Sequence, residues 1–174
     1  MKVSELHTTF LQEFGALLPG WKFVASQRRF KRNVGTANWL LHLAFINHEH
    51  DFDVIGDVAV EFLAARKRVA IIGAQLGNIA GVGQTRHAVS SPARAASAAR
   101  SLLAEFNQVG LRFLERYSAP AFAAAILRAG GPEARLISPF VQNHASQVAA
   151  LQELGAPPNN LFEADGSAAA QLKR

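Results

Sequence analysis

The segment Asn47-His48-Glu49-His50-Asp51-Phe52-Asp53 holds the densest group of side chains that could bind a metal ion. His48 and His50 would share a face if a strand extends to them, because alternate residues of a strand point the same way. The segment also lies where the chain must turn between two strands, and turns favour short polar residues. A turn is the simpler interpretation, so a metal-dependent enzyme at His48 and His50 is the last of three functional hypotheses.

A row of carboxylates follows. From 51 to 62, the apolar Phe52, Val54, Val58, Val60 and Phe62 alternate with residues that include Asp51, Asp53, Asp57 and Glu61. A strand with this period turns its apolar side chains to the core and its carboxylates to the other face. Neighbouring carboxylates could act as an acid and base pair, but an exposed sheet face explains the pattern more simply. We expect a solvated, partner-facing surface, and its candidate binding residues are Glu49, Asp51, Asp53, Asp57 and Glu61.

A basic cluster precedes this row. It comprises Arg28, Arg29, Lys31 and Arg32, with Trp21, Phe23 and Phe30 interleaved. Cations that bind phosphates and rings that stack on bases are typical of a nucleic-acid surface. An edge strand protected by cations explains the cluster equally well, and Arg29 and Lys31 could pair with the acids across the sheet. A nucleic-acid-binding module is therefore the second hypothesis.

Several chemistries are excluded by what the chain lacks. It has no cysteine, so disulfides, thiolate metal sites and thiol catalysis are excluded. The glycines between Gly73 and Gly83 match no phosphate-binding loop. Ser90 and Ser91 lack the motif that presents a hydrolase serine, and Ser91-Pro92 has the simpler role of a helix start. No catalytic group and no cofactor is implied, so we expect a protein that is not an enzyme.

The elements that would position these residues follow from apolar spacing and from the turn residues between them. We expect a helix over 3–18, strands at 21–24, 29–34, 38–47 and 51–62, and either a strand or a short helix within 64–83. Helices should follow at 91–117 with a possible break at Gly110, at 119–129 with Ser118 as cap, and at 140–154 with Ser138 as cap. The pattern predicts an α+β fold in which an N-terminal helix and an antiparallel β-meander precede a helical C-terminal half packed on the sheet.

Length and composition bound this fold. The chain has 174 residues, 49% of them hydrophobic and 18% charged, which favours one globular domain over 1–155 and a loosely ordered tail over 156–174. We find no signal-like apolar run and no stretch long enough to span a membrane, so we expect a cytoplasmic protein with no membrane partner. The formal charge is +5, and it is unevenly distributed, because the segment from Phe62 to Ala104 has six basic residues and no acid. The charge is segregated along the chain.

The order of these features resembles a bacterial family of uncharacterised domains. The resemblance covers about 3–127 and rests on Gly20-Trp-Lys-Phe23, Arg29-Phe-Lys-Arg32, Ile72-Gly73 and Gly110-Leu-Arg-Phe-Leu-Glu-Arg-Tyr-Ser118. The family is similar to immunity proteins of polymorphic toxin and contact-dependent growth inhibition systems. The resemblance implies a protein that binds a cognate toxin domain and blocks its active site or substrate groove, and it carries over no functional residue.

The net basic charge departs from that expectation, because inhibitors of basic nuclease toxins are usually acidic. A local row of carboxylates can still dock a cationic groove, since charges more than about 10 Å away are screened at 0.1 M salt. An immunity protein that binds its toxin through the five acids is therefore the leading hypothesis.

Overall fold

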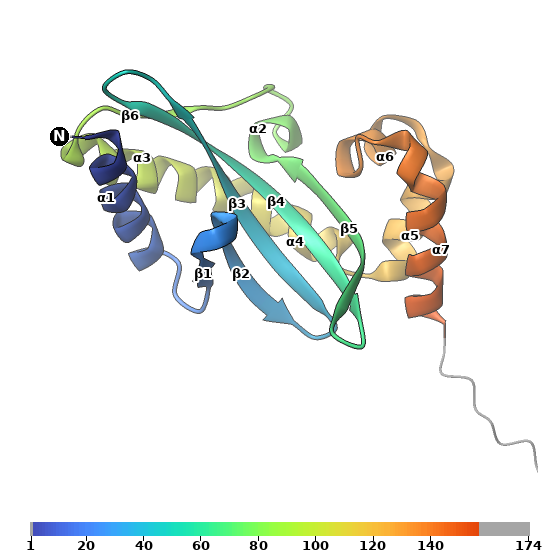
Figure 1. The fold of residues 1–174 in the computed structure, drawn as a ribbon. Coiled ribbons are helices and arrows are strands. Elements are labelled where there is room, and N and C mark those ends of the chain that lie inside the picture. The colour runs from blue at the N-terminus through green and yellow to red at the C-terminus, as the bar shows by residue number, and fades with distance from the viewer. Residues whose placement is uncertain (1, 157–174) are drawn as a thin grey trace, which may run out of the picture.

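A computed structural model describes residues 2–156 of the chain and shows an α+β fold (Figure 1). An N-terminal helix precedes a sheet of six strands, and the C-terminal half is helical. This arrangement confirms the predicted fold class. The predicted tail lies outside the described residues except for Ala156. Within the described part, no helix has the length and apolar character needed to cross a membrane.

The sheet is antiparallel throughout, with the order β1-β2-β3-β4-β5, and β6 pairs with the first residues of β4. The strands are β1 (Lys22–Val24), β2 (Arg29–Val34), β3 (Ala37–Asn47), β4 (Phe52–Ala64), β5 (Lys67–Gln75) and β6 (His87–Val89). The predicted meander is confirmed, and the undecided segment 64–83 contains both a strand, β5, and a short helix, α2 (Leu76–Ile79). Strand β6 was not expected, because its three residues lie between the glycines of 73–83 and the helix start at Ser91.

The helical elements are α1 (Val3–Ala16), η1 (Ala25–Gln27), α2 (Leu76–Ile79), α3 (Pro92–Glu105), η2 (Phe106–Gly110), α4 (Leu111–Tyr117), α5 (Pro120–Ala129), α6 (Gly131–Ile137), η3 (Val141–Asn143) and α7 (His144–Gly155). Helices α3 and α4 form the predicted long helix, and the predicted break at Gly110 is a π-helical turn, η2. The predicted cap at Ser91 is confirmed, because its side chain accepts a hydrogen bond from the Arg94 amide.

Two other predicted caps are wrong. Ser118 precedes the N-cap residue Ala119 and instead accepts a hydrogen bond from Trp39 Nε1 at 2.7 Å, which ties α4 to the sheet. Ser138 ends the unexpected helix α6, and its carbonyl accepts a hydrogen bond from His144 Nε2 at 2.7 Å. The Ser118 contact is tertiary, so local sequence does not report it, whereas the Ser138 contact is a local one between α6 and α7.

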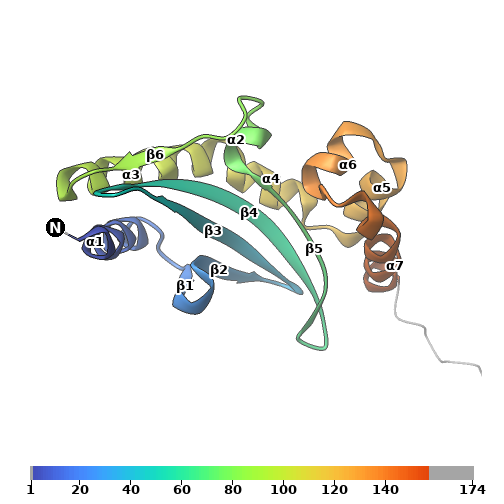
Figure 2. The same cartoon turned by 45° about the horizontal axis from the view of Figure 1, so that its top comes forward.

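The core lies against one face of the sheet, which we call the inner face. Phe52, Val54, Val58, Val60 and Phe62 of β4 point into it and are buried, as the alternation predicts. Helices α3 and α4 cross this face, and α5–α7 form a group beside β5 (Figures 1 and 2). A Cβ at Gly56 would lie 2.8 Å from side-chain atoms of both Leu76 and Leu102, so the close packing of the helices requires glycine there. The opposite, outer face carries the alternate residues of each strand.

Candidate functional site

Four polar side chains lie side by side across the outer face. The strand register places Arg29 opposite His42, His42 opposite Asp57, and Asp57 opposite Gln75. We call these four residues the transverse row. Directly opposite residues of antiparallel strands have Cβ atoms about 5 Å apart, so their side chains interact across the sheet. Asp57 therefore belongs to a row that runs across the strands as well as to the acidic row along β4.

The contacts of the transverse row leave two polar atoms without partners. His42 Nδ1 lies 3.3 Å from Asp57 Oδ2. Asp57 Oδ1 and Arg29 Nε are both buried and have no hydrogen-bond partner. A histidine neutralises a carboxylate only when it is protonated, and an unsatisfied buried polar atom costs about 1–3 kcal/mol. Although Oδ1 is buried, 31% of the Asp57 side chain is exposed, so the exposed part of this carboxylate can accept another donor.

Glu61 has a different environment from Asp57. Asn38 Nδ2 donates to Glu61 Oε2 at 2.8 Å, Asn33 donates to Asn38, and Arg29 Nη2 lies 4.0 Å from Glu61 Oε1. Only 7% of Glu61 is exposed. The expectation that Glu61 faces solvent is wrong, because this hydrogen-bonded chain and Arg29 enclose the carboxylate. The expected pairing of Arg29 with an acid across the sheet is present, and it is structural.

The other predicted acids lie near the turn between β3 and β4. The Glu49 side chain is 87% exposed and contacts only His50 among the described residues. Asp53 lies 3.4 Å from His48 Nε2 and 3.9 Å from Arg86 Nη1. Asp51 precedes β4, six positions or about 20 Å along the chain from Asp57. The five predicted acids therefore divide into a group at the turn, the isolated Asp57 and the buried Glu61.

The two histidines of the hypothetical metal site are separately engaged. His48 contacts Asp53 and His50 contacts Glu49. Neither lies within a strand, since β3 ends at Asn47. Within residues 2–156, no group of three or more histidine, aspartate or glutamate side chains is placed to hold a metal ion.

The predicted basic cluster does not form one surface. Arg28 has a left-handed backbone conformation, and its guanidinium lies 5.8 Å from the centre of the Phe45 ring. Arg29 and Lys31 lie on the outer face, whereas Arg32 is opposite Trp39 on the inner side of the strand. Successive residues of a strand point to opposite faces, so Arg32 lies on the other side of the strand from Arg29 and Lys31.

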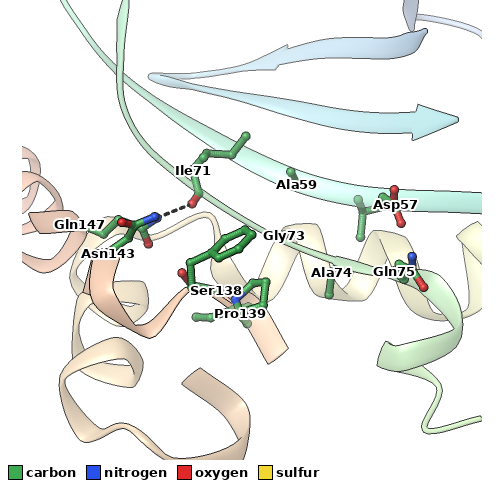
Figure 3. A pocket seen from close by; sticks show the side chains of 13 residues that line it. Asp57, Ala59, Ile71, Gly73, Ala74, Gln75, Ser138, Pro139, Asn143 and Gln147 are labelled. Atoms are coloured by element: carbon green, nitrogen blue, oxygen red, sulfur yellow. Dashed lines mark hydrogen bonds between the residues drawn. The ribbon is translucent and has the colours of Figure 1, made fainter. Parts of the chain in front are cut away.

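An open hollow adjoins the transverse row where β4 and β5 meet α6 and η3. Its volume is about 410 Å³, and its lining includes Asp57, Ala59, Gly73, Pro139, Phe140 and Gln147. We call it the β5 hollow. Asp57 and Gln75 lie at one end, Asn143 and Gln147 at the other, and Gly73 lies between them (Figure 3). A Cβ at Gly73 would come within 2.5 Å of the Val58 carbonyl oxygen, so this floor admits only glycine.

Exposed apolar side chains gather along the same edge. Phe140, with 62% of its surface exposed, lines the β5 hollow, and Val141 follows it. A second hollow of about 210 Å³ continues along β5, is lined by Val69, and shares Ile71, Asn143 and Gln147 with the first. Large exposed apolar side chains beside polar groups are typical of binding surfaces. Sequence reasoning missed this site because helices and strands far apart in the chain form it.

A further polar cluster joins helices away from the hollow. Tyr117 Oη donates to Glu133 Oε1 at 2.6 Å, and Arg116 Nη2 donates to the same oxygen at 2.9 Å. Both hydrogen bonds lower the pKa of Glu133, and the one from Tyr117 has the larger effect. Burial raises the pKa of Tyr117. The cluster fastens α4 to α6.

No family model, curated protein or solved structure matches this chain. The resemblance to immunity proteins therefore depends on the sequence motifs alone, and the binding surface depends on the geometry of the transverse row and the β5 hollow.

Proposed function

We propose that this protein is a non-enzymatic binding protein, an immunity protein that neutralises a cognate bacterial toxin by binding its toxin domain. The observation that best supports the proposal is the combination, on one surface, of an incompletely paired carboxylate at Asp57 with an exposed aromatic side chain at Phe140. Buried aromatic anchors and desolvated charge pairs supply most of the binding energy of protein interfaces.

The charge at Asp57 favours a basic partner. Among residues 2–156, the only basic group within 4.0 Å of Asp57 is His42, which is charged only when protonated. A guanidinium or ammonium group from the partner would bring a charged donor to the exposed part of this carboxylate, although its Oδ1 atom is buried. A basic toxin domain, such as one that acts on nucleic acid, has the matching charge.

The outer face supplies the additional area that a stable complex needs. A specific interface buries about 800 Å² on each partner, which exceeds the area of the hollow alone. The outer face of β2–β4 continues from the hollow, and helices α3 and α4 lie behind the sheet (Figure 1). Glu49 and Asp51 at the far turn would attract a basic partner and guide its approach.

The test is co-expression of this chain with the toxin-like product of the neighbouring gene, followed by affinity purification and a growth assay. We expect co-purification and rescue of growth. The double variant Asp57→Asn, Phe140→Ala should weaken rescue, and Glu13→Gln, an exposed acid on α1, should leave it unchanged. A neighbouring product that is neither toxic nor bound by this chain would contradict the immunity function.

A further inference from the structure

The edge of β5 has backbone groups that no strand pairs with in the described part of the chain. Strand β5 is the last in the sheet order, and its only strand partner is β4. The Ile71 carbonyl points away from β4, since it accepts a hydrogen bond from Gln147 Nε2 at 3.1 Å (Figure 3). Alternate residues of an antiparallel strand present their backbone groups to the same edge. The N–H and C=O of Gly73 therefore also point to this edge, inside the β5 hollow.

The Gln147 side chain shows what kind of group fits at this edge. Its carboxamide donates to Ile71 as the peptide group of an added strand would. Its own Oε1 is buried and has no hydrogen-bond partner. Buried polar groups are nearly always hydrogen-bonded, so this acceptor lacks an N–H donor. Because this oxygen is buried, a peptide N–H entering the hollow reaches it only if the Gln147 side chain rotates.

The remaining walls select the side chain. Ala59 and Gly73 leave a shallow floor along which the aliphatic stem of a long side chain can lie. The Asp57 carboxylate at the end of that floor favours a cation, and the exposed Phe140 ring can stack on one. An acidic side chain would meet the uncompensated charge of Asp57 and would be rejected.

We infer that the β5 hollow binds a short extended segment of the partner protein that carries an arginine or a lysine. The segment adds to the edge of β5 at Gly73 by β-augmentation, and its basic side chain reaches Asp57. The inference rests on the proposed function for the existence of a protein partner, and it names the part of that partner that is recognised.

The experiment uses the ¹⁵N-labelled full chain and the tripeptide acetyl-Ala-Arg-Ala-amide. We expect amide resonances of Ile71, Gly73 and Gln75 to shift, with a dissociation constant in the millimolar range that is usual for ligands of this size. The isosteric citrulline tripeptide should bind about tenfold more weakly, because it lacks the charge that strengthens the hydrogen bond to Asp57. The glutamate tripeptide should cause no shifts at these residues.

Variants locate the binding within the hollow. Asp57→Asn should weaken binding of the arginine tripeptide by about tenfold, so that it binds no more tightly than the citrulline tripeptide. Phe140→Ala, a change at an exposed side chain, should weaken it by about threefold through loss of the stacked ring. Glu13→Gln changes the net charge equally and should have no effect. The amide spectrum of each variant shows whether it is folded.

Several outcomes would overturn the inference. These are the absence of shifts at the β5 amides, equal binding of the glutamate tripeptide, or binding unaffected by both variants. Shifts of the same resonances with protein concentration alone would assign the hollow to a second copy of this chain, which also overturns it.

The outcome separates this inference from the immunity function. A toxin product that binds equally well to Asp57→Asn and Phe140→Ala would leave the function standing and remove the hollow from it. An arginine tripeptide that binds here, together with a neighbouring product that does not, would leave the hollow standing and contradict the function.

Discussion

His7 is a titratable side chain that packs against the aromatic core. Its ring stacks on Phe45 with centroids 4.5 Å apart and meets Phe52 edge-on, while Nε2 contacts Asn47 Oδ1 at 2.8 Å. Burial lowers the pKa of His7 below its ordinary value, and the charge of Arg28 lowers it further, whereas the hydrogen bond to Asn47 opposes both. The neutral ring is therefore the form that suits the folded state.

The direction of the pH effect follows from this pKa. The pKa of His7 is lower in the folded state, so the unfolded chain binds the proton more readily. The free energy of unfolding therefore falls as the pH drops below the ordinary histidine pKa of about 6.5. We expect His7→Gln, which keeps a hydrogen-bond donor but does not titrate, to lose less stability between about pH 7.5 and about pH 5.5. Urea denaturation at both pH values measures the difference.

His50 provides the matched control for that measurement. Its side chain is exposed and contacts only Glu49 among the described residues. The His50→Gln variant should therefore reproduce the wild-type pH dependence. A His7→Gln variant that does the same would show that His7 does not contribute to the pH dependence of stability.

At the scale of single elements, the cap of α3 is a prediction that both sequence and structure support. Ser91 Oγ accepts from the Arg94 amide, and Pro92 occupies the first turn. We expect Ser91→Ala to lower the free energy of unfolding by about 1 kcal/mol, because one helix N–H loses its partner. Urea denaturation should show a lower midpoint with an unchanged slope. Ser90→Ala, an exposed neighbour outside the cap, should change the midpoint little.

The π-helical turn η2 distinguishes local propensity from packing. Helix propensity alone predicts that Gly110→Ala stabilises the protein by about 1 kcal/mol. In the structure, the new Cβ would lie 2.7 Å from Phe106 Cδ2 and 2.8 Å from Leu76 Cδ2. Overpacking of this kind costs about 1–3 kcal/mol, so we expect a net loss of stability in thermal or urea unfolding.

Gly15 gives the comparison for Gly110. It lies in α1, and its new Cβ would meet the Phe30 ring at 3.6 Å, an ordinary contact. We expect Gly15→Ala to stabilise the protein by about 0.5–1 kcal/mol, since glycine loses more backbone freedom on folding. If Gly110→Ala stabilised the protein as much, the packing around η2 would have to be looser than the structure indicates.

Elements with a strong period were predictable, and those defined by tertiary contacts were not. The alternation along β4 is visible in sequence because one face is buried. Helix α6 was missed because Gly130-Gly131-Pro132 indicates an end, yet Pro132 also suits the first turn of the next helix. The same alternation made it predictable that the Asp57 side chain points to the outer face. Its neighbours Arg29, His42 and Gln75 were not, because cross-strand register is set by the turns and the core.

Across the whole molecule, the charge segregation seen in sequence becomes a separation in space. The turn before β4 carries Glu49 and Asp51. At the other end of β4, the turn residue Arg66 and the first residues of β5, Lys67 and Arg68, are exposed. A strand of 13 residues extends about 40 Å, which is several times the screening length of about 10 Å at 0.1 M salt. The two ends therefore act independently on a partner, despite the net charge.

The two sides of the β5 hollow differ in how firmly the rest of the molecule holds them. Strand β4 is paired on both edges and buries Phe52, Val54, Val58, Val60 and Phe62. Helix α7 buries only Leu151 of its 12 residues, and α6 buries Ala134 and Ile137. Elements with few buried apolar contacts open at lower free energy than the core.

We therefore expect the amides of α6 and α7 to exchange hydrogen faster than those of β3 and β4 in native-state exchange followed by mass spectrometry. Helix α3 is the control, because it buries Ala95, Ala98, Ala99 and Leu102 and should exchange as slowly as the sheet. An occupant of the β5 hollow contacts both walls, so it should slow exchange in α6 and α7 and leave α3 unchanged. Equal protection of α7 and β4 in the free protein would show instead that both walls are rigid and that the hollow is fully formed before binding.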